Sequence, residues 1–181
     1  PLALKTLLDA GEIKLDGFLL PGHVSTIIGS RPFSFLTEAY GLGGVISGFE
    51  PLDILQSVLM LTKQVKNRTP QVEIQYRRGV KAEGNPKALE VMDAVFEPAD
   101  AEWRGLGWIP GSGLALRETF GDLDAGRLFD LPLPLPRETK ECRCGDVLRG
   151  ILRPKACPLF ANACTPRNPI GPCMVSSEGS C

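Results

Sequence analysis

The residues with the clearest chemical potential are the cysteines, all of which fall in the last 40 residues of the chain. They are Cys142, Cys144, Cys157, Cys164, Cys173 and Cys181, spaced C-x-C-x12-C-x6-C-x8-C-x7-C. Thiolate sulfur is a soft ligand that suits zinc and iron–sulfur clusters. Six thiols in one proline- and glycine-rich segment therefore predict four metal ligands and two further thiols.

A structural zinc site is the alternative to an iron–sulfur cluster. Such sites commonly use four ligands in two close C-x2-C-like pairs, often with histidine. Here only Cys142 and Cys144 are close, and no histidine lies near them. The C-x2-C-x2-C spacing of bacterial ferredoxins is also absent. The spacing favours a cluster over zinc, in a protein that is not a simple electron carrier.

Three other residues are candidate catalytic side chains. His23, the only histidine, follows an expected strand, and in open α/β sheets ligands bind at the ends of the strands. His23 is therefore a candidate ligand or proton carrier. The alternative is a loop histidine that is hydrogen-bonded to a turn. Glu50 follows the next expected strand, where its carboxylate is a candidate site residue or a cap for the helix that begins there. Glu178, between the last two cysteines, is a candidate proton carrier or a solvated surface charge.

Upstream of the cysteines, strand-like and helix-like patterns alternate. Short apolar runs at 15–20, 44–48 and 72–76 predict strands, and amphipathic patterns at 2–10, 32–40, 51–65 and 87–96 predict helices. The residues that line one face of the helix beginning at Pro51 are Leu52, Leu55, Val58, Leu59, Thr62 and Val65. This alternation predicts an α/β fold whose mostly parallel sheet is covered by helices on both faces.

Proline occupies every second position near the end of this region, at 130–136, and predicts a stiff linker. The linker separates an expected α/β domain at 1–129 from a small, irregular, cysteine-rich iron–sulfur domain at 137–181. The second domain has too few large apolar residues to fold unaided. A metal cluster is expected to supply the missing core.

Composition excludes several classes of function. The 181 residues carry a net charge of -1, with basic and acidic residues intermingled, so nucleic acid is not an expected partner. No apolar stretch approaches the roughly 20 residues that span a bilayer, and no signal peptide is visible. We therefore expect no membrane association and a cytoplasmic location, where cysteine clusters more often serve metal or redox chemistry than structural disulfides. The first residue is Pro1, which predicts a fragment or a processed chain.

Longer motifs extend over most of the chain. They are LDGFLLPGHVSTIIGSRPF at 15–33, GFEPLDILQSVLML at 48–61, WRGLGWIPGSGL at 103–114, CRCGDVLRG at 142–150, CPLF at 157–160 and CTPRNPIGPCMVSSEGSC at 164–181. Together they closely resemble the HypD family of hydrogenase maturation factors. The family's N-terminal half, with its own cysteine motif, and its short aromatic tail have no counterpart here. The resemblance thus implies a C-terminal half that lacks its last residues.

The resemblance also implies a function and its partners. The expected role is a maturation scaffold with redox function, not a conventional enzyme, in complex with a HypC-type chaperone. On this scaffold the Fe(CN)2CO unit of NiFe-hydrogenase is assembled, so the cargo is iron carrying CN and CO ligands. A HypE-type protein donates the cyanide, and the hydrogenase large subunit is an indirect partner.

The family itself resembles ferredoxin:thioredoxin reductase, in which a 4Fe-4S cluster lies beside a redox-active cysteine pair. An iron–sulfur-dependent protein disulfide reductase is therefore the alternative function. The cluster ligands that the resemblance implies are Cys142, Cys157, Cys164 and Cys181. The implied redox-active pair is Cys144 with Cys173.

Overall fold

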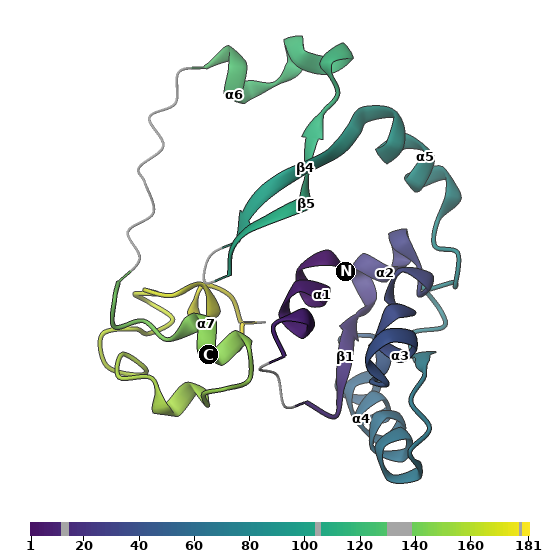
Figure 1. Ribbon diagram of the computed structural model, residues 1–181, viewed down its shortest axis with the longest axis vertical. Helices are drawn as coiled ribbons and strands as arrows, with labels where there is room; N and C mark the ends of the chain where they lie inside the picture. Colours follow the sequence, from purple (N-terminus) through teal and green to yellow (C-terminus); the bar gives the residue numbers. More distant parts are fainter. Residues whose placement is uncertain (12–14, 104–105, 130–138, 178) are drawn as a thin grey trace. The chain divides into compact units, whose positions relative to one another are not determined.

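The computed structural model describes residues 1–11, 15–103, 106–129, 139–177 and 179–181 (Figure 1). Internal contacts divide the chain into two compact units. The first unit comprises Pro1 and Leu15–Val95, and the second comprises Leu2–Lys14 and Phe96–Cys181. The predicted linker at 130–136 lies outside the described residues.

The first unit is built on a parallel sheet. Its strands are β1 (Gly17–Pro21), β2 (Gly43–Ser47) and β3 (Val72–Ile74), in the order β1-β2-β3. The central strand, β2, pairs in parallel with both neighbours and is buried along its whole length. The α/β class, the parallel sheet and the three predicted strands are therefore confirmed.

Helices follow each of these strands. They are α2 (Gly22–Ile28), a 3-10 turn (Arg31–Phe33) that leads into α3 (Phe35–Tyr40), α4 (Pro51–Asn67) and α5 (Pro86–Val95). All but α2 lie where the sequence predicts a helix. The sequence of α2, GHVSTII, is rich in β-branched residues, which favour strands. It is helical here, and Gly29, at a φ of 77°, ends it.

Helices cover both faces of β2. A Cβ built on Gly43 would lie 3.4 Å from Leu61 Cδ1 of α4, and one on Gly44 would lie 3.3 Å from Leu36 Cδ1 of α3. Because successive residues of a strand face opposite sides of the sheet, α4 and α3 pack on opposite faces.

The apolar stripe of α4 faces solvent, although such a stripe normally packs on a core. Leu52, Leu55 and Leu59 are 65%, 68% and 54% exposed. The buried residues of this helix are instead polar: Asp53, Ser57 and Gln64. Hydrogen bonds offset their burial, including one of 2.6 Å from the Gln64 amide to the Glu73 carboxylate. Polar contacts thus help to hold α4 on the sheet and leave its apolar stripe on the surface.

The second unit contains an antiparallel hairpin that the sequence does not predict. Strands β4 (Phe96–Trp103) and β5 (Gly107–Leu116) pair with each other, and α1 (Leu2–Asp9), which lies at a predicted helix, contacts β5. Leu8 of α1 and Ile109 of β5 are buried. Proline and acidic residues in β4, and glycines in β5, weaken the strand propensity that would reveal this hairpin.

The rest of the second unit consists mainly of short turns and loops. Its elements are the 3-10 turns at Glu118–Leu123, Pro154–Ala156 and Pro172–Met174 and the helices α6 (Ala125–Leu128) and α7 (Cys144–Leu148). The cysteine-rich segment is therefore irregular, as predicted. In the described part of the chain, no helix combines the length and the apolar character needed to cross a membrane.

Candidate functional site

Five of the six cysteines line one small cavity in the second unit. They are Cys142, Cys144, Cys157, Cys164 and Cys181. The other walls are Val147, Leu159, Phe160, Gly171 and Met174. About 10 Å³ of free space remains among these side chains, roughly the room that one water molecule needs. Folding therefore brings thiols that are distant in sequence around one apolar space.

The sixth cysteine, Cys173, lies beside Cys144 and is 3% exposed. Its backbone N–H donates a hydrogen bond to Cys144 Sγ at 3.4 Å, and its own thiol donates to the Cys144 carbonyl at 3.8 Å. None of the six cysteines forms a disulfide in this structure. These two residues are thus adjacent and joined by hydrogen bonds.

Two apolar clusters divide the cysteines. The Val147 cluster comprises Cys144, Val147 and Cys173, and the Leu159 cluster comprises Leu159, Cys164 and Met174. Cys157 packs against the Leu159 cluster only, whereas Cys142 and Cys181 pack against both clusters. The Val147 cluster therefore holds one pair of cysteines, and the other four all contact the Leu159 cluster.

Gly171 brings its backbone close to two sulfur atoms. A Cβ at this position would lie 2.4 Å from Cys144 Sγ and 2.6 Å from Cys142 Sγ. Real Cβ atoms do not approach other atoms this closely, so only glycine fits without a shift of the two thiols.

We expect Gly171→Ala to displace both sulfurs and to lower the free energy of unfolding of the second unit by about 1–3 kcal/mol, the usual cost of overpacking. Urea unfolding followed by circular dichroism measures this loss. Gly126→Ala is the matched control, because its Cβ would meet only a carboxylate oxygen of Asp124, at 3.2 Å. Equal stability of the two variants would contradict the steric role of Gly171.

Burial controls the ionisation of several of these thiols. It raises the pKa of the Cys142 and Cys181 thiols. It also raises the pKa of the Cys173 thiol, and the hydrogen bond with Cys144 raises it further. These groups are therefore protonated at neutral pH and would release protons when a metal binds.

The donor set fits an iron–sulfur cluster in its chemistry. Cysteine thiolates are the usual ligands of such clusters, and they bind different irons, so the sulfurs need not converge on one point. Among the described residues, no three histidine, cysteine, aspartate or glutamate side chains are grouped so that they could hold one metal ion.

The two predicted site residues of the first unit follow the ends of neighbouring strands. His23 is exposed in the first turn of α2, directly after β1, and its ring lies 5.1 Å from the Phe49 ring. Glu50 is the N-cap residue of α4, after β2, but its side chain makes no capping hydrogen bond. It forms an ion pair of 3.5 Å with Arg78 and is 75% exposed. The third candidate, Glu178, lies outside the described residues.

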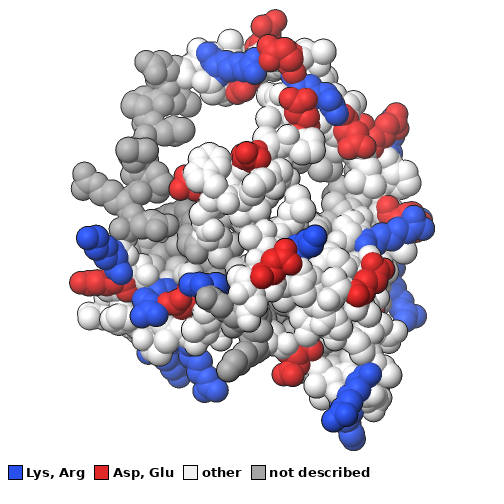
Figure 2. All heavy atoms as spheres, viewed as in Figure 1, with Lys and Arg blue, Asp and Glu red and all other residues white. Residues whose placement is uncertain are grey.

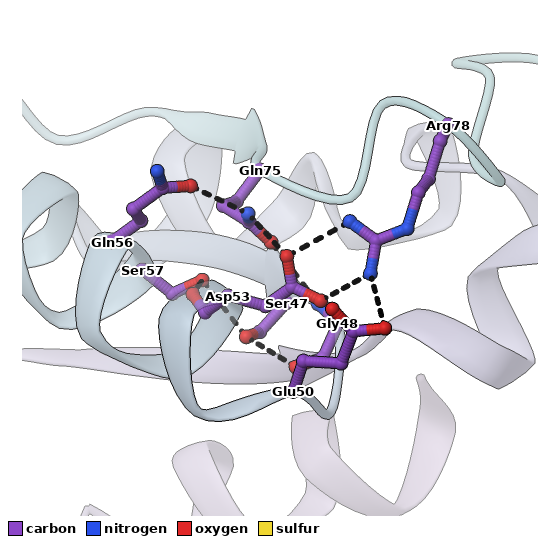
Figure 3. Close-up of polar contacts among 8 residues, drawn as sticks. All are labelled: Ser47, Gly48, Glu50, Asp53, Gln56, Ser57, Gln75 and Arg78. Atoms are coloured by element: carbon purple, nitrogen blue, oxygen red, sulfur yellow. Dashed lines mark hydrogen bonds and ion pairs between the residues drawn. The ribbon is translucent and has the colours of Figure 1, made fainter.

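A buried polar network next to Glu50 is not predicted from the sequence (Figure 3). Asp53, in the first turn of α4, accepts hydrogen bonds from Arg78 at 2.9 and 2.5 Å and from Gln75 at 2.9 Å. These donors hold the pKa of the Asp53 carboxyl at about 2, below its ordinary 3.8. The available signal was the spacing of polar residues at 53, 57 and 64, which places them on one side of a helix whose other side is apolar.

Asp53 makes the stability of the first unit depend on pH. Because its folded pKa is depressed, its contribution is complete above 3.8 and is lost as the pH falls through about 2. We expect Asp53→Asn to melt several degrees lower at neutral pH and to lose this part of the acid dependence. Thermal melts between pH 7 and pH 2 measure both effects. Asp16→Asn, at an exposed position, is the control, and an unchanged acid profile of Asp53→Asn would refute the assignment.

The comparison with known proteins identifies relatives along the whole chain. Residues 1–181 match the HypD family model, described as "Hydrogenase formation hypA family". The hydrogenase expression/formation protein HupD of Azotobacter chroococcum is 50% identical over 173 residues, 95% of this chain and 46% of that protein. The hydrogenase maturation factor HypD of Cupriavidus necator is 47% identical over 175 residues, 96% of this chain and 46% of that protein.

A more distant relative matches the complete chain. It is a putative hydrogenase expression/formation protein of Methanocaldococcus jannaschii, 43% identical over 181 residues, which are 100% of this chain and 50% of that protein. The chain spans about half the length of the curated relatives it matches. Since the family model covers every residue, the chain belongs to the HypD family.

Proposed function

We propose that this chain is the cysteine-rich part of a cytoplasmic scaffold for hydrogenase maturation. The family model and the names of the relatives support a role in hydrogenase maturation. The observation that carries the redox part of the proposal is the gathering of five thiols around one apolar cavity, with the sixth hydrogen-bonded to one of them. Such a protein is a scaffold with redox-active thiols and not a conventional enzyme.

Four cysteines are assigned to a 4Fe-4S cluster. They are Cys142, Cys157, Cys164 and Cys181, which line the small cavity and pack in or against the Leu159 cluster. Ile170 contributes a backbone N–H that donates to Cys164 Sγ at 3.3 Å and orients that thiol.

Cys144 and Cys173 are assigned to a redox-active dithiol. A bound cluster would supply electrons one at a time, so an adjacent cysteine pair would be needed to store the two electrons that reduce a disulfide. Their mutual contacts in the Val147 cluster hold the two thiols in position for this role. The lack of a side chain at Gly171 leaves room for the sulfurs of both Cys144 and Cys142.

The carboxyl ends of β1 and β2 are assigned to binding of the cargo, the iron that carries CN and CO ligands. His23 and Glu50 are candidates for proton transfer or for contact with the Fe(CN)2CO unit, and the exposure of both side chains supports this role. Glu178 remains a candidate near the cysteines. The proposed partners are a HypC-type chaperone, a HypE-type cyanide donor and, indirectly, the hydrogenase large subunit.

Anaerobic reconstitution tests the cluster assignment. We expect about four irons per chain and a broad visible absorption band, because a 4Fe-4S cluster has that stoichiometry. One zinc and no iron after anaerobic purification would overturn the assignment. Copurification of the full-length protein with the small chaperone tests the scaffold assignment.

The second candidate function is an iron–sulfur-dependent protein disulfide reductase. The contact between Cys144 and Cys173 favours it, because adjacent thiols suit disulfide exchange. The two functions differ in their partners. Turnover of a protein disulfide without the chaperone supports the reductase, whereas a stable complex with the chaperone supports the scaffold.

A further inference from the structure

A second cavity lies beside Cys144 in the same unit. It measures about 240 Å³ and is open to solvent on one side. Cys142, Cys144 and Gly171 line both this outer cavity and the small inner one. Cys173 lines neither of the two. The C-x-C segment thus lies between a thiol-lined interior and an open cavity, and Cys144, which is 7% exposed, is the member of the proposed pair that lines the open cavity.

The charged residues that line the outer cavity are Arg143, Asp146 and Arg149. The Asp146 carboxylate lies between the two guanidinium groups, accepting a hydrogen bond from Arg143 Nε and another from Arg149 Nη2 at 2.8 Å. Among the described residues of this wall, two positive groups and one negative group leave a net positive charge. The ion pairs fix both guanidinium groups beside the cavity.

The surrounding segment is also basic. Residues 137–181 contain seven Lys or Arg and four Asp or Glu, whereas the whole chain has a net charge of -1. Figure 2 shows several basic side chains on the surface in the part of the view where Figure 1 draws this segment. A negatively charged molecule is therefore attracted to this segment more than to the chain as a whole.

We propose that the outer cavity is the port through which an anionic disulfide reaches Cys144, with Arg143 and Arg149 selecting for the negative charge. This proposal rests on the proposed dithiol role of Cys144 and Cys173. Cys144 is then the exchange thiol, because it lines the open cavity. Cys173 is the resolving thiol, because it is buried and hydrogen-bonded to Cys144.

The exchange is balanced in atoms and electrons. The Cys144 thiolate attacks the incoming disulfide, a mixed disulfide forms, and one thiolate of the ligand leaves and takes up a proton. The Cys173 thiol then loses its proton as its sulfur attacks Cys144 Sγ, and the second ligand thiolate leaves and takes up that proton. The chain dithiol is oxidised to a disulfide by two electrons, and the ligand disulfide is reduced to two thiols.

Two disulfide reagents that differ in charge test the port. Dithiobis(nitrobenzoate) carries two carboxylates, and dithiodipyridine is neutral at pH 7. The full chain, reconstituted with iron, reduced and kept anaerobic, is mixed with each reagent in the Cys173→Ser background, where the adduct on Cys144 persists, and mass spectrometry follows the adduct on each cysteine. The readout is the ratio of the two reaction rates at Cys144, so partial unfolding, which changes both rates, does not mimic a charge effect.

We expect Arg143→Gln and Arg149→Gln each to lower the anionic-to-neutral rate ratio at Cys144 by about threefold, the order expected for one unit charge several ångströms away in water. Arg153→Gln and Arg167→Gln are the matched controls, because these exposed arginines belong to the same segment but do not line the cavity. A ratio that is unchanged in both cavity variants, or lowered equally in the controls, overturns the proposal.

The order of the two thiols has its own test. In Cys173→Ser we expect the adduct to remain on Cys144, and in Cys144→Ser we expect slow labelling of Cys173. Faster labelling of Cys173 than of Cys144 overturns the assigned order. Oxidised glutathione and an acidic cystine-containing peptide then distinguish a small-molecule source from a protein source. Because iron content is measured separately, failure of the cluster assignment and failure of the port are distinguishable.

Discussion

Replacing Cys164 with serine should remove the iron–sulfur cluster and unfold the cysteine-rich segment. Cys164 is buried in the Leu159 cluster and lines the small cavity. The segment has few large apolar side chains, so its folding free energy depends on bound metal, which contributes on the order of 10 kcal/mol in small metal-dependent domains. We expect iron content to fall from about four per chain to below one, with loss of visible absorption. Iron analysis and the optical spectrum measure both.

Cys144→Ser is the matched control for this substitution. Cys144 is equally buried and lines the same cavity, but it belongs to the Val147 cluster. The proposed division therefore predicts that Cys144→Ser stays brown and loses only disulfide exchange. The division of the six cysteines is wrong if Cys144→Ser is colourless while Cys164→Ser keeps its iron.

His23→Ala should abolish hydrogenase maturation when it is introduced into the full-length family protein. The His23 ring is exposed at the end of β1 and contacts the Phe49 ring, so its removal creates no buried cavity. We therefore expect an unchanged melting temperature and an unchanged iron content, together with loss of active hydrogenase. Hydrogenase activity in cells that carry the variant measures the effect.

Val24→Ala is the matched control for His23→Ala, because it removes an exposed side chain from the next position of the same helix. This variant should mature hydrogenase normally. Normal maturation by a stably folded His23→Ala protein would reduce His23 to a surface residue without a role in the cargo site.

The first unit was largely predictable because its sequence signals are local. Apolar runs bounded by glycine and proline mark the strands, and Pro51 marks the start of α4. The helix α2 was not predicted, because its β-branched residues favour a strand and only tertiary contacts decide otherwise. The hairpin of β4 and β5 was missed for the opposite reason, since its strands lack the usual strand-forming residues.

The orientation of α4 shows a different limit of sequence patterns. Its apolar stripe indicates a buried face, yet Asp53 and Ser57 are buried and Leu55 is exposed. Periodicity reveals that a helix has two faces. Which face meets the sheet depends here on Arg78 and Gln75, which follow β3 and donate hydrogen bonds to Asp53. Such partners are distant in sequence and leave no local signal.

The sequence predicts which residue types form the candidate site, but not which cysteines lie together in it. Six thiols in one segment indicate metal or redox chemistry, but the spacing alone does not separate ligands from a redox pair. That separation depends on which loops pack together. The contact of Cys173 with Cys144 and the packing of Cys157 on the Leu159 cluster are properties of the folded segment.

Because the leucines of α4 are exposed to solvent, only some assays can detect the effect of replacing them. A polar replacement of Leu55 removes apolar area that is already in contact with water, so it costs the fold little. Screens that score thermal stability or proteolysis are therefore insensitive to this surface. The same replacement changes the association of the chain with other molecules. Light scattering and binding measurements therefore detect the effect of these side chains, whereas thermal melting does not.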